Sequence, residues 1–180
     1  NSTLKHVYFS FCDLSVADFE SCNIEFTTFK ATNLKYSKMK NITGEYVTIL
    51  DSDLNNINIA HTSIDDLEIA DSKANQAHFE QVTLKTPIIS NLDLAKSTLT
   101  DIEVRYGQFI NCEMDYAKLY NSHISNTNLS NVSFDGVNMK NTYLPECKFK
   151  NSSITGTTFT SRQLKDIQLI NTATVNYDTK

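Results

Sequence analysis

Residues that could transfer protons or act as nucleophiles occur in this chain of 180 residues, but their spacing does not assemble a catalytic site. Asp65, Asp66 and Glu68 form a carboxylate cluster, yet no neighbouring group would tune any of them as a general acid or base. The four histidines are spread along the chain, at His6, His61, His78 and His123. The four glycines form no phosphate-binding loop. We therefore expect no enzymatic activity and no cofactor.

The cysteines also lack the spacing of a metal site or a redox motif. Each of the four lies two positions before a member of a series of regularly spaced residues: Cys12, Cys22, Cys112 and Cys147. Small side chains recur at that position throughout the chain, which indicates that the cysteines act as small buried hydrophobic residues. We expect all four thiols to be reduced and inaccessible, and we expect no metal ion.

The series consists of a large apolar residue at every fifth position, from Leu4 to Leu169. Only Gly44 and Ala74 interrupt this series. A second series, made of small residues, occupies the position two residues before each large one. A helix buries apolar residues at a period of about 3.6 and a strand at a period of 2, so neither can bury a period of five. The chain must turn once in every repeat and stack its coils into a solenoid with a continuous core.

Polar residues beside the large apolar residues carry a family resemblance. An Asp or Asn comes directly before the large residue in Asp13-Leu14, Asp18-Phe19, Asn33-Leu34, Asp53-Leu54, Asp93-Leu94, Asn128-Leu129 and Asn138-Met139. In this feature the chain resembles the pentapeptide-repeat family from about residue 2 to residue 170. The resemblance implies an all-β fold, a right-handed, four-sided parallel β-helix with about 20 residues per coil and roughly eight coils.

The pattern loosens near the end of the chain, where Arg162 occupies a small inward position. We therefore assign residues 1–160 to the β-helix and residues 161–180 to a C-terminal cap and tail. Thr160 and Ser161 can cap a short helix from Arg162 to Ile170 that covers the last coil. The repeat is already in register at its first member, so we expect the chain to be a domain excised from a longer protein.

The surface positions carry an asparagine series and an acidic zone. We expect a hydrogen-bonded corner ladder of Asn91, Asn111, Asn131, Asn151 and Asn171, continued by Asp71 and Asp51. The acidic zone around it consists of Asp51, Asp53, Asp65, Asp66, Glu68 and Asp71. A solvated surface is the simpler interpretation, and a cation or a basic partner is the alternative. The net charge of -5 argues against a nucleic-acid ligand, because phosphates need a cationic surface.

Exposed aromatic residues indicate where a protein partner could bind. Phe11 and Phe26 lie outside the buried series, and Phe26 shares a corner with His6 and Tyr46 when the sequence is folded at 20 residues per coil. Tyr36 lies on another corner. We predict partner binding at Phe11, Phe26, Tyr36 and Tyr46, because exposed aromatic patches are typical of interfaces. The alternatives are a neighbouring domain that covers them, or scattered surface aromatics, including a weaker second group of Tyr106, Tyr116, Tyr120 and Tyr143.

These observations favour a non-catalytic protein-interaction scaffold. The abundance of Asn, Lys, Ile and Thr is similar to that of β-helix domains in secreted bacterial effectors, including virulence proteins with HECT-like ubiquitin ligase domains, where the β-helix recruits host proteins. A different class of function is also open: the family includes DNA mimics that inhibit or protect DNA gyrase. No signal peptide or membrane-spanning run is visible, so we expect no membrane partner. The location stays open between secretion into a host cell and the bacterial cytoplasm.

Overall fold

The chain turns two positions after each large apolar residue, because the residue there has a left-handed backbone conformation. From His6 to Gly156, every fifth residue has a positive φ, between 48° and 71°. Asn, Asp and Gly reach this conformation at little cost, which explains why Asn and Asp are frequent at these positions. Bulkier residues such as Val16 and Tyr46 adopt it as well. One turn per repeat gives each coil four corners and four faces.

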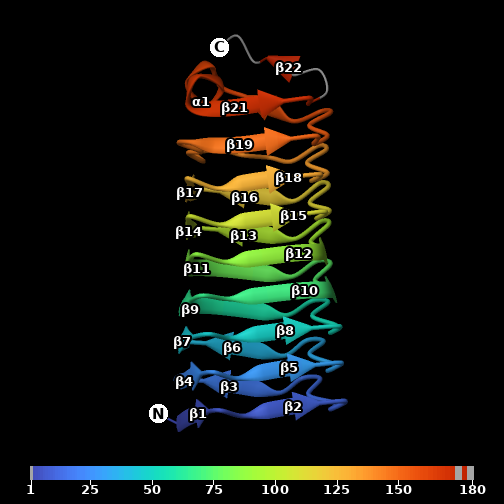
Figure 1. Ribbon diagram of the computed structural model, residues 1–180, viewed down its shortest axis with the longest axis vertical. Helices are drawn as coiled ribbons and strands as arrows, with labels where there is room; N and C mark the ends of the chain where they lie inside the picture. Colours follow the sequence, from blue (N-terminus) through green and yellow to red (C-terminus); the bar gives the residue numbers. More distant parts are fainter. Residues whose placement is uncertain (1, 173–175, 178–180) are drawn as a thin grey trace.

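The computed structural model describes residues 2–172 and 176–177, which form a column of stacked coils with β1 at one end and α1 and β21 towards the other (Figure 1). Each strand pairs in parallel with the strand twenty residues further along, as Phe9 does with Phe29 and Ile59 with Phe79. Four repeats therefore close one coil. This confirms the solenoid that the period of five predicted and the all-β parallel fold that the family resemblance implied.

One face of the column is a 9-stranded sheet. We call it the nine-stranded face. Its strands, in order along the column, are β2 (Tyr8–Ser10), β5 (Thr28–Lys30), β8 (Thr48–Leu50), β10 (Glu68–Lys73), β12 (Ile88–Asp93), β15 (Gln108–Ile110), β18 (Asn128–Ser130), β19 (Cys147–Lys150) and β21 (Ile167–Ile170).

An 11-stranded sheet covers the first and fourth faces. The first face begins with β1 (Ser2–Lys5), β4 (Cys22–Glu25) and β7 (Thr43–Glu45) and ends with β14 (Glu103–Arg105) and β17 (His123–Ser125). The fourth face holds β3 (Asp18–Glu20), β6 (Lys38–Lys40), β13 (Thr98–Thr100) and β16 (Lys118–Tyr120). Two longer strands run around the corner and join these faces: β9 (Asn58–Asp65) and β11 (His78–Lys85). On the third face, isolated bridges such as Asp13 with Asn33 link most coils.

The core is the stack of inward-pointing large and small residues. Phe29, Phe134 and Phe149 are completely buried, and each buried large side chain contributes about 1.5 to 3 kcal/mol of transfer free energy. Polar members of the small series are satisfied by hydrogen bonds along the column. The Ser52 hydroxyl, for example, donates to the Leu50 carbonyl at 2.7 Å and accepts from the Thr32 amide at 3.1 Å.

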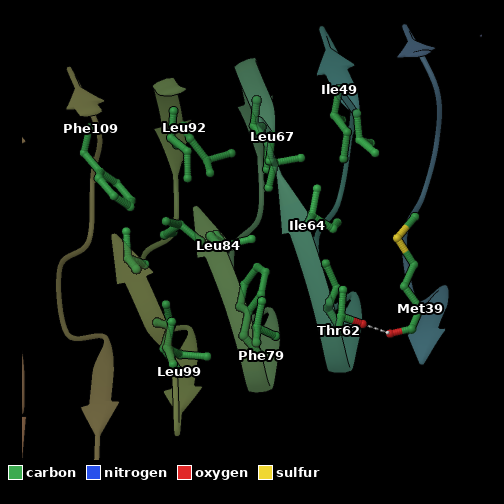
Figure 2. A pocket seen from close by; sticks show the side chains of 18 of the residues that line it. Met39, Ile49, Thr62, Ile64, Leu67, Phe79, Leu84, Leu92, Leu99 and Phe109 are labelled. Carbon is green, nitrogen blue, oxygen red and sulfur yellow. Dashed lines mark hydrogen bonds between the residues drawn. The ribbon is translucent and has the colours of Figure 1, made fainter. Parts of the chain in front are cut away.

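The centre of the column contains an apolar cavity of about 80 Å³. Figure 2 shows side chains from facing strands that converge on it, among them Ile64, Leu67 and Phe79. Thr62 is the polar residue in its lining, and its hydroxyl is turned to backbone carbonyls, 2.9 Å from that of Ala60. Such a cavity stays empty of water because it offers water no polar partners.

The first coil is less buried than the others. Leu4, Phe9, Leu14 and Phe19 are only partly buried, although they pack against the core. The reason is that, among the described residues, no coil lies on their N-terminal side. From Ile24 onwards most of the large residues are fully buried, and the exceptions are Phe79, Leu99, Leu164 and Leu169.

The exposure of the first coils corrects one sequence-based expectation. We expected four inaccessible cysteines, but Cys12 and Cys22 are partly exposed, and only Cys112 and Cys147 are buried. All four are free thiols. Burial raises the pKa of the Cys112 thiol and raises the pKa of Cys147 to about 12. The series of small residues points inward throughout. An inward side chain is buried only where a coil lies on each side of it.

The helix near the C-terminus is shorter than expected. α1 spans Ser161–Asp166, and its N-cap Thr160 forms a capping box with Gln163. The expected helix over residues 162–170 was wrong in its second half, because Ile167–Ile170 is β21, which pairs with β19. Leu169 lies in the repeat series, and pairing it with Phe149 continues the sheet. A further small sheet joins β20 (Thr158–Phe159) to β22 (Asn176–Tyr177).

Candidate functional site

The side chains with acid–base or metal-binding chemistry do not converge. In residues 2–172, no three His, Cys, Asp or Glu side chains are placed to hold a metal ion. His61 Nδ1 lies 2.6 Å from Gln81 Oε1, and His78 Nε2 lies 3.7 Å from Glu80. No helix in the described part of the chain has the length and apolar character needed to cross a bilayer. The candidate site described below is a surface.

Three aromatic rings stack on one corner near the N-terminal end of the column. The ring centroids of His6 and Phe26 are 5.0 Å apart, and those of Phe26 and Tyr46 are 4.9 Å apart. The interplanar angles are 18° and 23°. Because consecutive members sit at the left-handed corner of consecutive coils, the side chains point outward and the rings lie one above another. Phe26 remains 42% exposed and Tyr46 46% exposed.

Two further aromatic residues lie beside this stack. Tyr8 is exposed on β2, and Phe11, at the next corner, is 83% exposed. Together they border the nine-stranded face at its N-terminal end. We call the set His6, Tyr8, Phe11, Phe26 and Tyr46 the N-terminal aromatic patch.

The structure divides the four predicted binding residues. Phe26 and Tyr46 are in contact, and Phe11 borders the same face, but Tyr36 lies on the corner after the third face, in the column of Val16. Sequence reasoning missed Tyr8. The signal was available, because Tyr8 directly precedes the buried Phe9 and must therefore point outward from its strand.

The second group of aromatic residues is also mostly exposed, but its rings do not stack on one another. The Tyr116 ring lies across Gly136, where an added Cβ would come within 2.8 Å of it. The guanidinium of Arg162 lies 4.8 Å from the centroid of the Tyr143 ring. Tyr106 is exposed on the same corner as Tyr46, three coils further along. The rings that stack freely on each other are thus concentrated at the N-terminal end.

An acidic belt covers three of the four faces of the column directly after the aromatic patch. Residues 41–72 contain no Lys or Arg but seven carboxylates, which we call the acidic belt: Glu45, Asp51, Asp53, Asp65, Asp66, Glu68 and Asp71. Two of them form ion pairs with residues outside this segment, Asp53 with Lys35 at 2.9 Å and Asp65 with Lys85 at 3.5 Å. The Asp53 carboxylate raises the pKa of Lys35.

Next to this belt the predicted asparagine ladder is continuous from Asp71 to Asn131, and Asn171 donates separately to Asn151 at 3.4 Å. The Asn91 side-chain amide donates to Asp71 at 2.7 Å, Asn111 donates to Asn91 at 3.1 Å, and Asn131 donates to Asn111 at 3.0 Å. The ladder stabilises the corner and orients one carboxylate of the belt. The Asp51 carboxylate, the next member of the column, forms no hydrogen bond or ion pair within residues 2–172, although its backbone amide donates to the Ala70 carbonyl at 3.1 Å.

Comparison with known proteins agrees with this geometry. A family model of a pentapeptide repeat region matches residues 105–178, and a model of pentapeptide repeats in eight copies matches residues 1–40. The chain belongs to the pentapeptide-repeat family. A search of curated protein sequences gives no match.

Solved structures of the same family resemble this column. A trypsin-treated form of QnrB1, a plasmid-mediated fluoroquinolone resistance protein, aligns with a TM-score of 0.52 at 10% identity over 98% of this chain and 92% of that chain. HetL, involved in heterocyst differentiation regulation in the cyanobacterium Nostoc sp., aligns with a TM-score of 0.35 at 11% identity over 99% and 87% of the two chains. At this identity, the likeness to QnrB1 shows the fold and not the function.

Proposed function

We propose that this pentapeptide-repeat protein is a non-catalytic scaffold that binds a protein partner through the N-terminal aromatic patch. The stack of His6, Phe26 and Tyr46 carries the proposal. Exposed aromatic rings are the commonest anchors of protein interfaces. These rings also lose little conformational entropy on binding, because stacking and the parallel coils beneath already hold them in place.

Within the patch, Phe26 and Tyr46 are the proposed centre and Phe11 the proposed edge. Tyr36 faces another direction, so it would contact the same partner only if that partner wrapped around the column. The patch is flanked by the carboxylates of Glu45 and Asp66, which favours a partner with Lys or Arg at the edge of its interface.

Replacing Phe26 and Tyr46 together with Ser tests this proposal. The matched control replaces Tyr106 and Tyr116 with Ser, because it also removes two exposed rings. Removing an anchor costs about 2 kcal/mol, which is roughly a thirtyfold loss of affinity. We expect the Phe26 and Tyr46 variant to lose specific partners in quantitative pull-down experiments while the control retains them. If both variants retain the same partners with equal affinity, the patch is not the binding site.

The acidic belt supports a second candidate function, a DNA mimic that acts on DNA gyrase. Seven carboxylates without a Lys or Arg in residues 41–72 create a negative surface suited to a basic DNA-binding groove. Changing Asp51, Asp66 and Asp71 to Lys tests this candidate. Inhibition of gyrase supercoiling by the wild type that disappears in the triple variant would favour the DNA mimic. We rank the scaffold first and expect no inhibition.

A finer proposal concerns the setting of the scaffold. From composition we propose that it is the partner-recruiting or substrate-recruiting domain of a larger secreted bacterial effector that acts inside a host cell, of the kind fused to a HECT-like ubiquitin ligase. The sequence of the complete gene tests this proposal. A downstream domain with a catalytic cysteine would support it, and a complete gene that encodes the β-helix alone would contradict it.

A further inference from the structure

The middle of the nine-stranded face is almost free of charge. The outward residues on this face of β8, β10, β12, β15 and β18, which we call the central strip, are Thr48, Leu50, Glu68, Ala70, Ile88, Ser90, Gln108, Ile110, Asn128 and Ser130. Glu68 is the single charged member. Ile88 is 45% exposed, although it is a large apolar residue in the middle of a regular sheet.

The first and third faces carry more charges at the equivalent outward positions. Over the same coils, Asp65, Lys85, Glu103 and Arg105 lie on the first face, and Asp53, Lys73, Asp93 and Glu113 lie on the third. Exposed large apolar residues also gather around the nine-stranded face. Those that lie on it or at its two bordering corners are Tyr8, Phe11, Phe26, Tyr46, Ile88, Tyr106 and Ile170. A flat, uncharged sheet face of this kind is suited to packing against a second sheet.

We propose that a second copy of this chain packs on the nine-stranded face and forms an antiparallel, face-to-face dimer. Nine strands at a spacing of about 4.8 Å span about 38 Å, and a width of about five residues adds about 16 Å in the other direction. The face therefore offers about 600 Å² per copy. The arrangement selected below leaves β2 uncovered and overlaps eight strands, so two copies would bury about 1,100 Å², slightly more than the roughly 1,000 Å² that a specific interface needs.

The charges at the ends of the face select one arrangement of the two copies. If the columns ran parallel, β19 would face β19 and Lys148 would meet Lys150. In an antiparallel dimer, a twofold symmetry axis that runs across the column relates the two copies. If this axis passed through β12, β19 would face β5 of the other copy and Lys150 would meet Lys30. If the axis passes between β12 and β15, β19 faces β8, and Lys150 meets Leu50 with the Asp51 carboxylate beside it. Of these three arrangements, only the last avoids like-charge contacts and adds opposite-charge ones.

The arrangement has a second favourable contact and leaves the first coil uncovered. Lys148 of one copy faces β8 of the other copy, and Glu68 of that other copy lies on β10, one coil away from β8. These opposite charges therefore also approach each other. The axis pairs β5 with β21, and β2 extends beyond the second copy. Tyr8 and Phe11 in the first coil therefore remain exposed at both ends of the dimer. The inference does not depend on the proposed function.

Sedimentation velocity, from micromolar to about 1 mM protein, tests the dimer through a charge exchange. We expect Lys150→Asp and Asp51→Lys each to weaken dimerisation by about tenfold or more, since the symmetry alters two contacts at once. The double variant should recover affinity to within about threefold of the wild type, because the charges are then exchanged and not lost. Lys118→Asp, an exposed position on the fourth face, is the control and should leave dimerisation unchanged.

An additional variant, Ile88→Glu, places a charge in the central strip. It should abolish the dimer and leave the circular dichroism spectrum and melting temperature nearly unchanged, because the side chain is already half exposed. A wild type that stays monomeric over the whole concentration range overturns the proposal. If Ile88→Glu still dimerises, the dimer does not use the nine-stranded face. If the double charge variant does not recover the affinity that each single variant loses, the proposed arrangement of the two copies is wrong.

Discussion

The left-handed corners make a quantitative prediction that one substitution can test. Lys96 is exposed at a corner with φ of 61°, and none of its side-chain atoms forms an ion pair within residues 2–172. A left-handed conformation costs a residue other than Gly roughly 1 to 2 kcal/mol, and Asn adopts it at a smaller cost. Lys96→Asn should therefore increase the free energy of unfolding by about 1 kcal/mol. Equilibrium unfolding in urea measures this change.

Lys118→Asn is the matched control for this prediction. Lys118 is exposed in the next coil, but it lies on the extended strand β16, so the same change removes the same charge without relieving a left-handed residue. Asn is disfavoured in strands, and the control should be neutral or slightly destabilising. If Lys96→Asn lowers the free energy of unfolding, or if both variants change it by the same amount, the left-handed conformation at this corner does not limit stability.

Other predictions follow from burial and charge. Phe109→Ala should cost about 3 to 5 kcal/mol of unfolding free energy because it opens a cavity in the core, whereas Asn111→Ala in the corner ladder should cost about 1 kcal/mol; chemical denaturation that gives equal losses would contradict the assignment of inward and outward residues. Thiol titration of the native protein should modify Cys12 far faster than Cys147, whose pKa is raised to about 12 by burial. Partial loss of hydration, followed by the neighbouring carboxylates of Asp93 and Asp115, raises the pKa of the exposed Glu113 above its usual 4.5, so ionised Glu113 opposes folding at neutral pH. Glu113→Gln should raise the melting temperature at pH 7, and this gain should vanish as the pH falls below 4.5, where the wild-type carboxyl is protonated in both states; a gain that persists in acid would refute the electrostatic cause.

The sequence predicted the fold because the period of five leaves only one way to bury the large residues. The same period assigned Phe26 and Tyr46 to one corner, and their rings are in contact. The conformation of that corner was not predicted. Asn and Asp indicate a turn, but only the stacked coils show that aromatic residues at the same position must also adopt a positive φ.

The remaining differences arise where a residue's surroundings depend on more than its own repeat. Cys12 and Cys112 occupy equivalent positions, but a coil covers only the second from both sides. Leu169 belongs to the apolar series in a segment that also suits a helix, and pairing with Phe149 decides in favour of a strand. The central strip was not predicted from the sequence. Its uncharged residues lie twenty positions apart and come together only when the coils are stacked.

Because strands pair with strands twenty residues later, the face on which a surface residue lies depends on how many repeats precede it. An insertion of one repeat would keep every large residue in the core, but it would rotate all later surface residues by a quarter of a coil. Placed after Asn55, such an insertion would move Ile110 off the face that displays Leu50, while the aromatic stack before it would stay intact. An insertion of twenty residues would only lengthen the column. Surface function in this protein can therefore be lost or acquired by a change of face that leaves the composition of the core unchanged.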